Sequence, residues 1–183
     1  MSEIILFNPI KEEDGILRDL CQDENIDIIE ISMKDLDQKV GYLASIEGFE
    51  KNDVESDFEE KYDFTFMLFK GFSNEEIFAF VKKMKEKNLY IAHKAAITEH
   101  NIKWPLRFLL DENDDEHQTM GLIHEINSLV KIAHDHKEAH GENEEIKNHV
   151  NKINTYFNTP EGFNLEEARK LRDELEEMVK KLD

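Results

Sequence analysis

Residues 64–76 read Phe-Thr-Phe-Met-Leu-Phe-Lys-Gly-Phe-Ser-Asn-Glu-Glu, and this stretch decides the fold. Its first part, Phe64–Phe69, is the most apolar run of the chain and is typical of a strand that is buried on both faces of a sheet. Ser73 is followed three residues later by Glu76, which is the pattern of a helix capping box. A buried strand followed at once by a helix predicts a sheet covered by helices.

The same alternation of strand and helix patterns occurs on both sides of this stretch. Ile4–Phe7 predicts a first buried strand, and apolar residues at helical spacing predict a helix that ends near Asp23. Two further strands are expected at Ile26–Ile31 and Ile91–Thr98. We therefore expect an α/β fold with a four-stranded, mainly parallel sheet in the order 2-1-3-4 and with flanking helices.

The connection between the second and third strands leaves one alternative open. Apolar residues at helical spacing predict a short helix within residues 33–48, although Gly41 lowers the helical propensity there. If this segment is not a crossover helix, the same elements also fit a ferredoxin-like α+β fold.

The pattern changes after residue 110, because no strand signal follows. Three apolar stripes at helical spacing occupy residues 122–133, 146–157 and 165–182. The acidic tract 111–116 is interpreted as a solvated linker that follows a short helix at Leu106–Leu110. The predicted domains are a small α/β domain at 1–110 and an all-α extension of about three helices at 111–183.

Composition limits the choice of partners and compartment. The 183 residues include 23 Lys+Arg and 42 Asp+Glu, so the net charge is −19, which argues against a nucleic acid or an anionic membrane as partner. No apolar run approaches the roughly 18 residues of a membrane span. The single cysteine, Cys21, cannot form an intrachain disulfide, and the N-terminus has no signal-peptide pattern. We expect a cytoplasmic protein.

Open α/β sheets bind ligands at the carboxyl ends of their strands, and this edge supplies the predicted site. The candidate ligand-binding residues at this edge are Asn8, Gly71, Phe72, Ser73, Asn74, Thr98 and Asn101. The sequence shows no pair of nucleophile and base and no phosphate-binding loop, so enzymatic activity is not favoured and no cofactor is expected. The predicted function is a non-enzymatic module that binds a small ligand or a protein at this edge. The alternative is a small enzyme of unknown reaction that uses the polar residues of the same edge.

Two features of the helical extension suggest other roles. Leu171, Leu175 and Met178 lie on one face of the last predicted helix, and we expect this face to mediate association, with a homodimer as one outcome. His136 and His140 are four residues apart, a spacing at which two imidazoles can meet one zinc ion. Because no cysteine accompanies them and the metalloprotease pattern is not met, no metal site is expected.

The order of short motifs in the first domain resembles a known family. The motifs are Ile4–Asn8, Gly41–Leu43, Glu47–Glu50, Met67–Ser73, Lys94–Thr98 and Trp104. They resemble a bacterial family of domains of unknown function, DUF3783, over about residues 3–110, and leave the helical tail outside. The resemblance implies no activity, cofactor or catalytic residue, so it supports the domain boundary alone.

Overall fold

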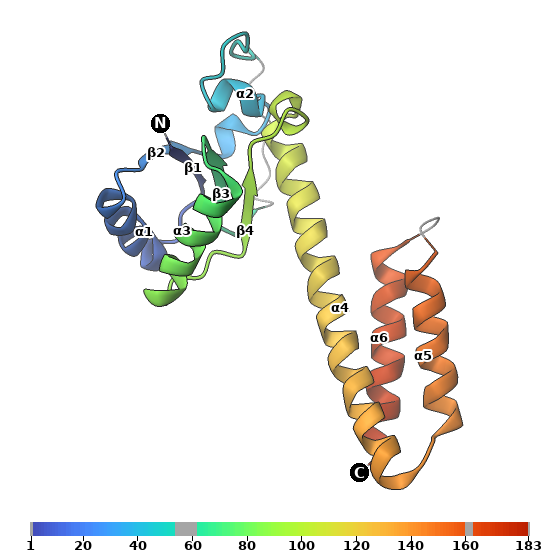
Figure 1. The fold of residues 1–183 in the computed structure, drawn as a ribbon. Helices are drawn as coiled ribbons and strands as arrows, with labels where there is room; N and C mark the ends of the chain where they lie inside the picture. The colour runs from blue at the N-terminus through green and yellow to red at the C-terminus, as the bar shows by residue number, and fades with distance from the viewer. Residues whose placement is uncertain (1, 54–61, 160–162, 183) are drawn as a thin grey trace. The chain divides into compact units, whose positions relative to one another are not determined.

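The structure is a computed structural model that describes residues 2–53, 62–159 and 163–182 (Figure 1). The chain divides into two compact units, Met1–Asp115 and Glu116–Asp183, called here the N-terminal unit and the C-terminal unit. Helix α4 (Leu106–His140) begins in the first unit and continues into the second. No helix among the described residues combines the length and the apolar character that crossing a bilayer requires.

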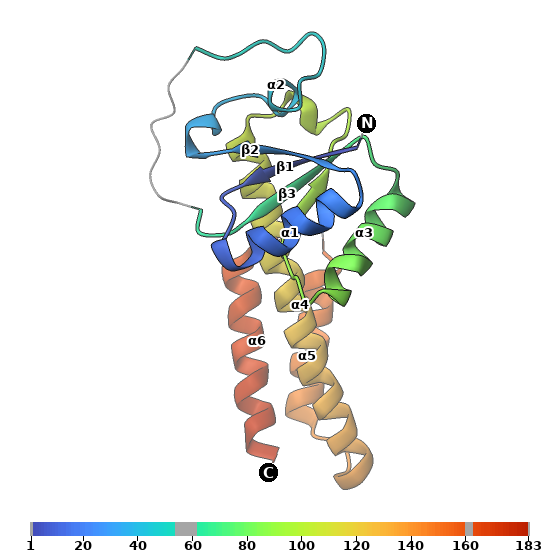
Figure 2. The same ribbon diagram turned by 90° about the vertical axis from the view of Figure 1, so that its left-hand side faces the viewer.

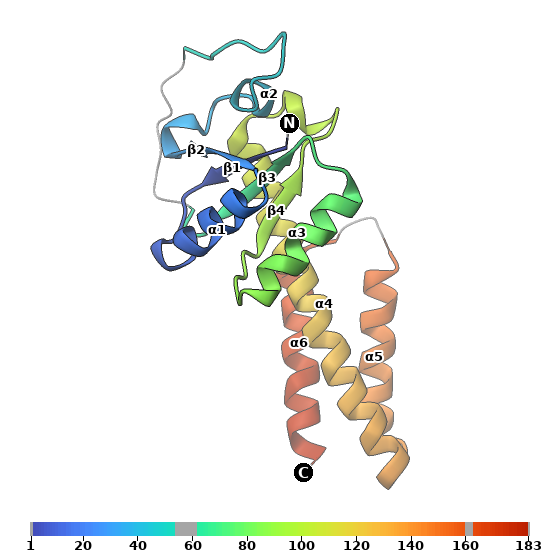
Figure 3. The ribbon, with the colours of Figure 1, turned by 60° about the vertical axis from the view of Figure 1, so that its left-hand side comes forward.

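The N-terminal unit is a sheet with helices on both faces. Its elements are β1 (Glu3–Phe7), α1 (Lys11–Asp23), β2 (Asp27–Ile31), the 3-10 turn η1 (Met33–Asp35), α2 (Val40–Leu43), β3 (Phe66–Lys70), α3 (Asn74–Glu86), β4 (His93–Ala96), the 3-10 turn η2 (Asn101–Lys103) and the start of α4. The strand order is β2-β1-β3-β4, as predicted. Helices α1 and α3 pack on one face of the sheet (Figures 2 and 3), and α2 and the start of α4 pack on the other.

The two central strands form the core of this unit. Ile5, Leu6, Phe66 and Leu68 are completely buried, which confirms that neither strand has a face in water. Successive side chains of a strand point to opposite faces, so Ile5 packs toward α2 and α4 while Leu6 packs toward α1 and α3.

The direction of one strand pair differs from the prediction. β1 is parallel to β2, and β3 is parallel to β4, but β1 and β3 are antiparallel, with Phe7 opposite Phe66. The prediction that these adjacent central strands are parallel is therefore wrong. Helix α2 has four residues and is only about 6 Å long, so it cannot carry the chain back along a strand of about 17 Å. The ferredoxin-like alternative is also wrong, because neighbouring strands of that fold are antiparallel.

The N-terminal unit contains an internal structural repeat. In each copy a five-residue strand, three linking residues and a 13-residue helix follow one another, first from Glu3 and again from Phe66. The first linking residue has a positive φ in both copies, at Asn8 and Gly71. An asparagine with positive φ follows each helix at the second position, Asn25 in the first copy and Asn88 in the second. Because β1 and β3 are antiparallel, the copies are related by an approximate two-fold axis between these strands.

The C-terminal unit is a three-helix bundle built from the remainder of α4, α5 (Glu144–Phe157) and α6 (Leu165–Val179), followed by the 3-10 turn η3 (Lys180–Leu182). Its core consists of the buried residues Leu122, Ile126, Ile146, Ile153, Ala168, Leu171, Leu175 and Val179. All three predicted stripes therefore pack against one another within one chain (Figure 1).

Helix α4 continues where a linker was expected. The acidic tract 111–116 is helical, and the short helix predicted at 106–110 is the first part of α4. Tertiary contacts stabilise this region, since Asp111 accepts a hydrogen bond from Tyr62 and Asn113 contacts His93. The charge pattern of the tract alone could not reveal these contacts.

Candidate functional site

The antiparallel pairing of β1 and β3 places the predicted site residues at two opposite ends of the sheet. Asn8 follows the last residue of β1, which lies opposite Phe66, the first residue of β3. Gly71 follows the last residue of β3 and lies at the other end, where Thr98 and Asn101 follow the parallel strand β4. We call these the Asn8 end and the Gly71 end. The prediction that Asn8 lies beside the Gly71 turn is therefore wrong.

The turn at the Gly71 end leads from β3 into α3 and caps the start of this helix. Gly71 has a φ of 74°, a conformation that glycine adopts at little cost. The Ser73 hydroxyl accepts the Glu76 backbone N–H at 3.3 Å, and the Glu76 carboxylate accepts the Ser73 N–H at 2.7 Å. These hydrogen bonds hold the pKa of Glu76 below its ordinary value. The predicted capping box is confirmed, and it engages the side chains of both residues, with Asn74 as the first residue of the helix.

The turn after β4 is closed by its own side chains. The Asn101 Oδ1 accepts the Thr98 N–H at 2.8 Å, and its Nδ2 donates to the Ala96 carbonyl at 2.8 Å. The Thr98 hydroxyl in turn accepts the Asn101 N–H at 3.2 Å. Thr98 and Asn101 thus stabilise the turn after β4 at the Gly71 end.

A surface pocket opens at the Gly71 end between α3 and the turn from α1 to β2. Its volume is about 310 Å³. It is lined by Ser2, Glu24, Asn25, Ile26, Phe72, Glu76, Ala79, Phe80 and Lys83. Of the predicted site residues only Phe72 lines it, and the Phe72 ring packs edge-on against Phe69 and Phe80. We call this cavity the Phe72 pocket.

The polar groups of the Phe72 pocket come from residues that sequence reasoning missed. Glu24 and Lys83 form an ion pair of 2.6 Å across the two helices, which lie side by side (Figure 3). Asn25 has a φ of 54° and ends the turn after α1. The signal that could have located the pocket is the repeat itself, because it places the end of α1 beside α3, where Glu24 pairs with Lys83 and Asp23 pairs with Lys87.

Asn8 has a structural role at its own end of the sheet. Its Nδ2 donates to the carbonyls of Tyr62 at 3.2 Å and Phe64 at 3.3 Å. The Thr65 hydroxyl donates to the Asn8 carbonyl at 3.1 Å and accepts the Ile10 N–H at 3.0 Å. Asn8 therefore fixes the chain that enters β3, and its amide is engaged by the protein itself.

A polar cluster beside Asn8 joins α4 to the sheet and was also missed. The Tyr62 hydroxyl donates to Asp111 at 2.8 Å, and the buried His93 ring stacks on Phe64 with centroids 3.9 Å apart. His93 Nδ1 lies 3.2 Å from the Asn113 side chain. Burial, followed by the hydrogen bond and charge of Asp111, raises the pKa of Tyr62, so the phenol stays protonated as a hydrogen-bond donor. The cluster is suited to holding α4 in place.

The histidine pair lies near the end of α4. The rings of His136 and His140 have centroids 4.7 Å apart. Within the described ranges, no group of three His, Cys, Asp or Glu residues is arranged to hold a metal ion. The expectation that this pair forms no zinc site stays a prediction.

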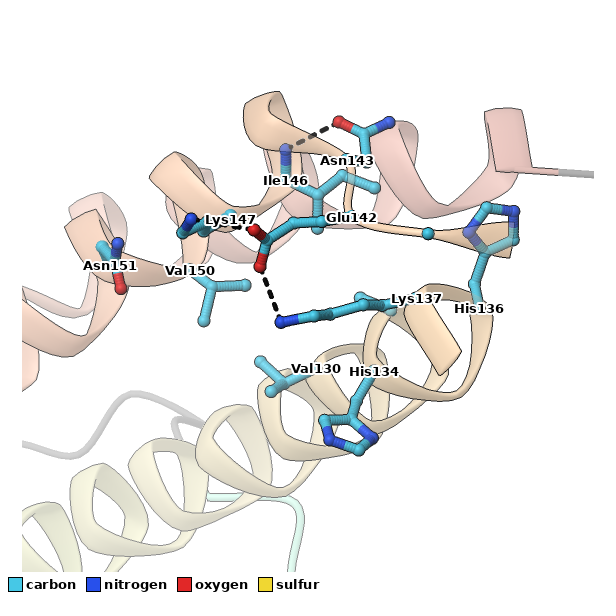
Figure 4. A pocket seen from close by; sticks show the side chains of 12 residues that line it. Val130, His134, His136, Lys137, Glu142, Asn143, Ile146, Lys147, Val150 and Asn151 are labelled. Atoms are coloured by element: carbon cyan, nitrogen blue, oxygen red, sulfur yellow. Dashed lines mark hydrogen bonds and ion pairs between the residues drawn. The ribbon is translucent and has the colours of Figure 1, made fainter. Parts of the chain in front are cut away.

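A smaller apolar pocket of about 160 Å³ lies between α4 and α5 in the C-terminal unit (Figure 4). Val130 and Val150 contribute to its apolar lining. Glu142 accepts hydrogen bonds from Lys137 at 2.6 Å and Lys147 at 2.9 Å, which lower its pKa to about 2. These ion pairs join Lys137 of α4 and Lys147 of α5 through Glu142, so they stabilise the turn between the two helices.

The residues predicted to mediate association face the core of their own bundle. Leu171 and Leu175 are buried against α4 and α5, and Met178 packs against the same cluster. The tail helices do pair with one another, as expected. The homodimer stays a prediction, and any contact with a second copy would need side chains outside this core.

Comparison with known proteins supports part of the resemblance. A family model described as a domain of unknown function (DUF3783) matches residues 65–120. The match includes the motifs from Met67–Ser73 to Trp104 and does not extend to the motifs before β3. No curated protein and no solved structure matches the chain. The family description carries no activity.

Proposed function

We propose that the protein is a non-enzymatic binding module whose N-terminal unit holds a small ligand in the Phe72 pocket. The carrying observation is that aromatic side chains and polar side chains from α3 and from the turn after α1 line one pocket at the Gly71 end of the sheet. The pocket volume of about 310 Å³ lies in the range of roughly 300–1,000 Å³ that is usual for small-molecule sites.

The lining indicates the chemistry of the ligand. The half-buried Phe72 offers apolar ring surface, on which a flat or aliphatic group can pack, and the buried Phe80 ring packs against Phe72. Asn25 offers an amide, and the Glu24–Lys83 pair offers both a hydrogen-bond acceptor and a donor. A small molecule with an apolar body and a neutral polar end therefore fits better than a multiply charged one, because the paired charges cancel.

The engagement of the candidate catalytic groups favours binding over reaction. Ser73 and Glu76 are committed to the helix cap, and the lowered pKa of Glu76 makes its carboxylate a weaker base. Thr98 and Asn101 bond to each other. A catalytic role for these residues would require breaking contacts that form the turns.

Association through the helical tail is the second part of the proposal. The exposed side chains Met120 and Ile132 of α4 are the apolar groups that a second copy could cover. Sedimentation at micromolar concentration should detect a dimer that Ile132→Asp dissociates. A monomer at all concentrations would reject this part and leave the pocket proposal unaffected.

Filling the pocket provides the test of the main proposal. Ala79 lines the Phe72 pocket, so Ala79→Phe should occupy its space. Ala139, an exposed alanine of α4, allows the matched control Ala139→Phe. A library of small aromatic amides is screened by protein-detected NMR, and hits are expected to shift the resonances of Phe72 and Asn25. The shifts should vanish in Ala79→Phe and persist in the control.

Two results would contradict the proposal. One is a screen whose hits perturb only residues away from the Gly71 end. The other is ligand binding that Ala79→Phe and Ala139→Phe leave equally intact, because the ligand would then occupy another site.

A further inference from the structure

One flank of α3 exposes the most accessible large apolar side chain described in the chain. Phe78 is 76% exposed. Lys82 and Lys85 follow it at positions i+4 and i+7, so the three side chains project from the same side of the helix. Ala79 and Lys83, which line the Phe72 pocket, project from the other flank. The exposed flank is thus separate from the proposed ligand site.

The exposed flank continues onto the segment that leads into β4. The Lys94 Nζ lies 5.6 Å from the centroid of the Tyr90 ring, and Tyr90 is 66% exposed. Burial, followed by the positive charge of Lys85, lowers the pKa of Lys94. Tyr90 follows the end of α3 by four residues, so Tyr90 and Lys94 continue the chain directly from this helix. We call Phe78, Lys82, Lys85, Tyr90 and Lys94 the α3 cationic face.

We propose that the α3 cationic face docks a short acidic segment of a partner protein. The face carries three lysines and two exposed aromatic rings on a chain whose net charge is −19, so these lysines are a local concentration of positive charge on an acidic protein. Among the residues that the structure describes, Lys82 and Lys85 form no ion pair with a carboxylate, whereas Lys83 and Lys87 of the same region pair with Glu24 and Asp23. Lys94 also has no carboxylate partner there, and its Nζ donates to the backbone carbonyls of Ile91 and Ala92, which carry no net charge. Carboxylates of a partner can pair with these lysines, while an apolar side chain of the same partner covers Phe78.

The spacing of the face defines the segment. Lys85 lies seven positions after Phe78 in the helix, which corresponds to about 10 Å along the axis. An extended peptide covers this distance with about three residues. The partner segment therefore carries an apolar residue and two or more carboxylates within about four positions.

The edge of the sheet beside this face has two backbone carbonyls that are already engaged, which disfavours an added strand. The Lys94 carbonyl accepts the Asn113 Nδ2 at 3.3 Å, and the Ala96 carbonyl accepts the Asn101 Nδ2 at 2.8 Å. These two of the four β4 carbonyls are thus occupied by side-chain amides. The partner is recognised by side chains rather than by strand addition.

An acidic protein segment fits the face better than a nucleic acid does. A polyphosphate chain would extend past three lysines onto a strongly acidic protein, and repulsion acts over a Debye length of about 8 Å at physiological salt. A segment of four residues stays within the face. A nucleic acid is therefore the competing occupant that the experiment must separate.

Peptide selection on the full chain tests the proposal. A phage library of random 12-residue peptides is selected on the wild-type protein, and the recovered peptides are labelled with fluorescein for anisotropy titrations. We expect them to combine carboxylates with an apolar residue. Phe78→Ser and the double variant Lys82→Glu, Lys85→Glu should each weaken binding by about ten-fold or more. The control Lys103→Glu, an exposed lysine in η2, should change the affinity by less than about two-fold.

Two further measurements complete the test: one uses peptides of reversed charge, and the other uses an oligonucleotide as a competing ligand. A peptide whose acidic residues are replaced by lysine should bind the Lys82→Glu, Lys85→Glu variant better than the wild type. The proposal is overturned if no acidic peptide is recovered, or if the variants and the control bind equally well. It is also overturned if a 20-nucleotide oligothymidylate binds more tightly than the best peptide and is lost in the double variant. The selected peptides should still bind the Ala79→Phe protein, because that variant fills the Phe72 pocket and leaves the α3 cationic face intact. This measurement distinguishes peptide binding at the face from ligand binding in the pocket.

Discussion

Truncating Phe66 to alanine should remove much of the stability of the N-terminal unit. Phe66 is completely buried in β3 opposite Phe7. A buried aromatic side chain covers about 150–250 Å², which at about 25 cal/mol per Å² corresponds to about 4–6 kcal/mol. Because the denatured chain already buries part of this area, we expect a loss of about 3–5 kcal/mol in the free energy of unfolding.

The matched control is the same truncation at Phe78, which is 76% exposed. Phe78→Ala should change the unfolding free energy by no more than about 0.5 kcal/mol. The single tryptophan, Trp104, packs edge-on against Phe108 in the N-terminal unit, so its fluorescence reports the unfolding of this unit in urea. With a slope of about 2 kcal/mol/M, Phe66→Ala should lower the midpoint by about 2 M. Equal midpoints for the two variants would refute the placement of Phe66 in a doubly covered strand.

Three further predictions concern other parts of the chain. Leu175→Ala should destabilise the C-terminal unit by about 2–5 kcal/mol, measured by circular dichroism, because Leu175 is fully buried; a loss below about 1 kcal/mol would contradict the intrachain bundle. Asn88→Ala should cost about 1 kcal/mol because Asn88 has a φ of 56°, whereas Asn88→Gly should be nearly neutral in thermal unfolding; equal effects would argue against a left-handed residue there. The Glu142 carboxyl should titrate by NMR with a pKa of about 2, since Lys137 and Lys147 stabilise its charged form. Its contribution to stability is present above the ordinary value near 4.5 and is lost as the pH falls toward 2; a midpoint near 4.5 would show that these ion pairs do not form in solution.

Local sequence patterns predicted the strands and helices of the fold. The relative directions of the strands depended instead on the long connection between β2 and β3. The apolar run at Phe66–Phe69 and the Ser73 capping box identify a buried strand and the start of a helix from a few adjacent residues. The direction of β3 relative to β1 depends on where the chain re-enters the sheet after residue 32. Periodic apolar residues suggest a helix at 33–48, but they do not show that its regular part has only four residues. The sequence signal was therefore right about burial and wrong about direction.

The candidate site was less predictable because its residues were placed by analogy with a parallel sheet. Reversing β3 moves Asn8 to the opposite end and brings the turn after α1 to the Gly71 end instead. Phe72 was found because it follows a central strand, whereas Asn25 and Lys83 had no signal beyond being polar residues in or near helices. Ser73, Thr98 and Asn101 were predicted as site residues because they are polar. In the structure their polar groups form hydrogen bonds within the helix cap and the turn after β4.

The internal repeat explains how the two ends of the sheet are built in the same way. The Thr65 hydroxyl donates to the Asn8 carbonyl at 3.1 Å, and the Ser2 hydroxyl donates to the Gly71 carbonyl at 3.4 Å. Thr65 and Ser2 occupy equivalent positions immediately before the two strands, and Asn8 and Gly71 are the equivalent residues after them. A hydroxyl from one copy thus anchors the left-handed turn of the other copy at each end.

The two ends of the sheet have the same backbone arrangement and differ in their side chains. Phe72 occupies the position of Pro9, so an aromatic ring stands at the Gly71 end where the other copy has a small ring. Ala79 occupies the position of Ile16, so the helix surface beside Phe72 lacks three carbon atoms that the other copy carries. A pocket opens where a large ring projects next to a short side chain, and that combination occurs in the second copy. The backbone symmetry thus produces two similar ends, and the difference between Ile16 and Ala79 accounts for the open space of the Phe72 pocket at the Gly71 end.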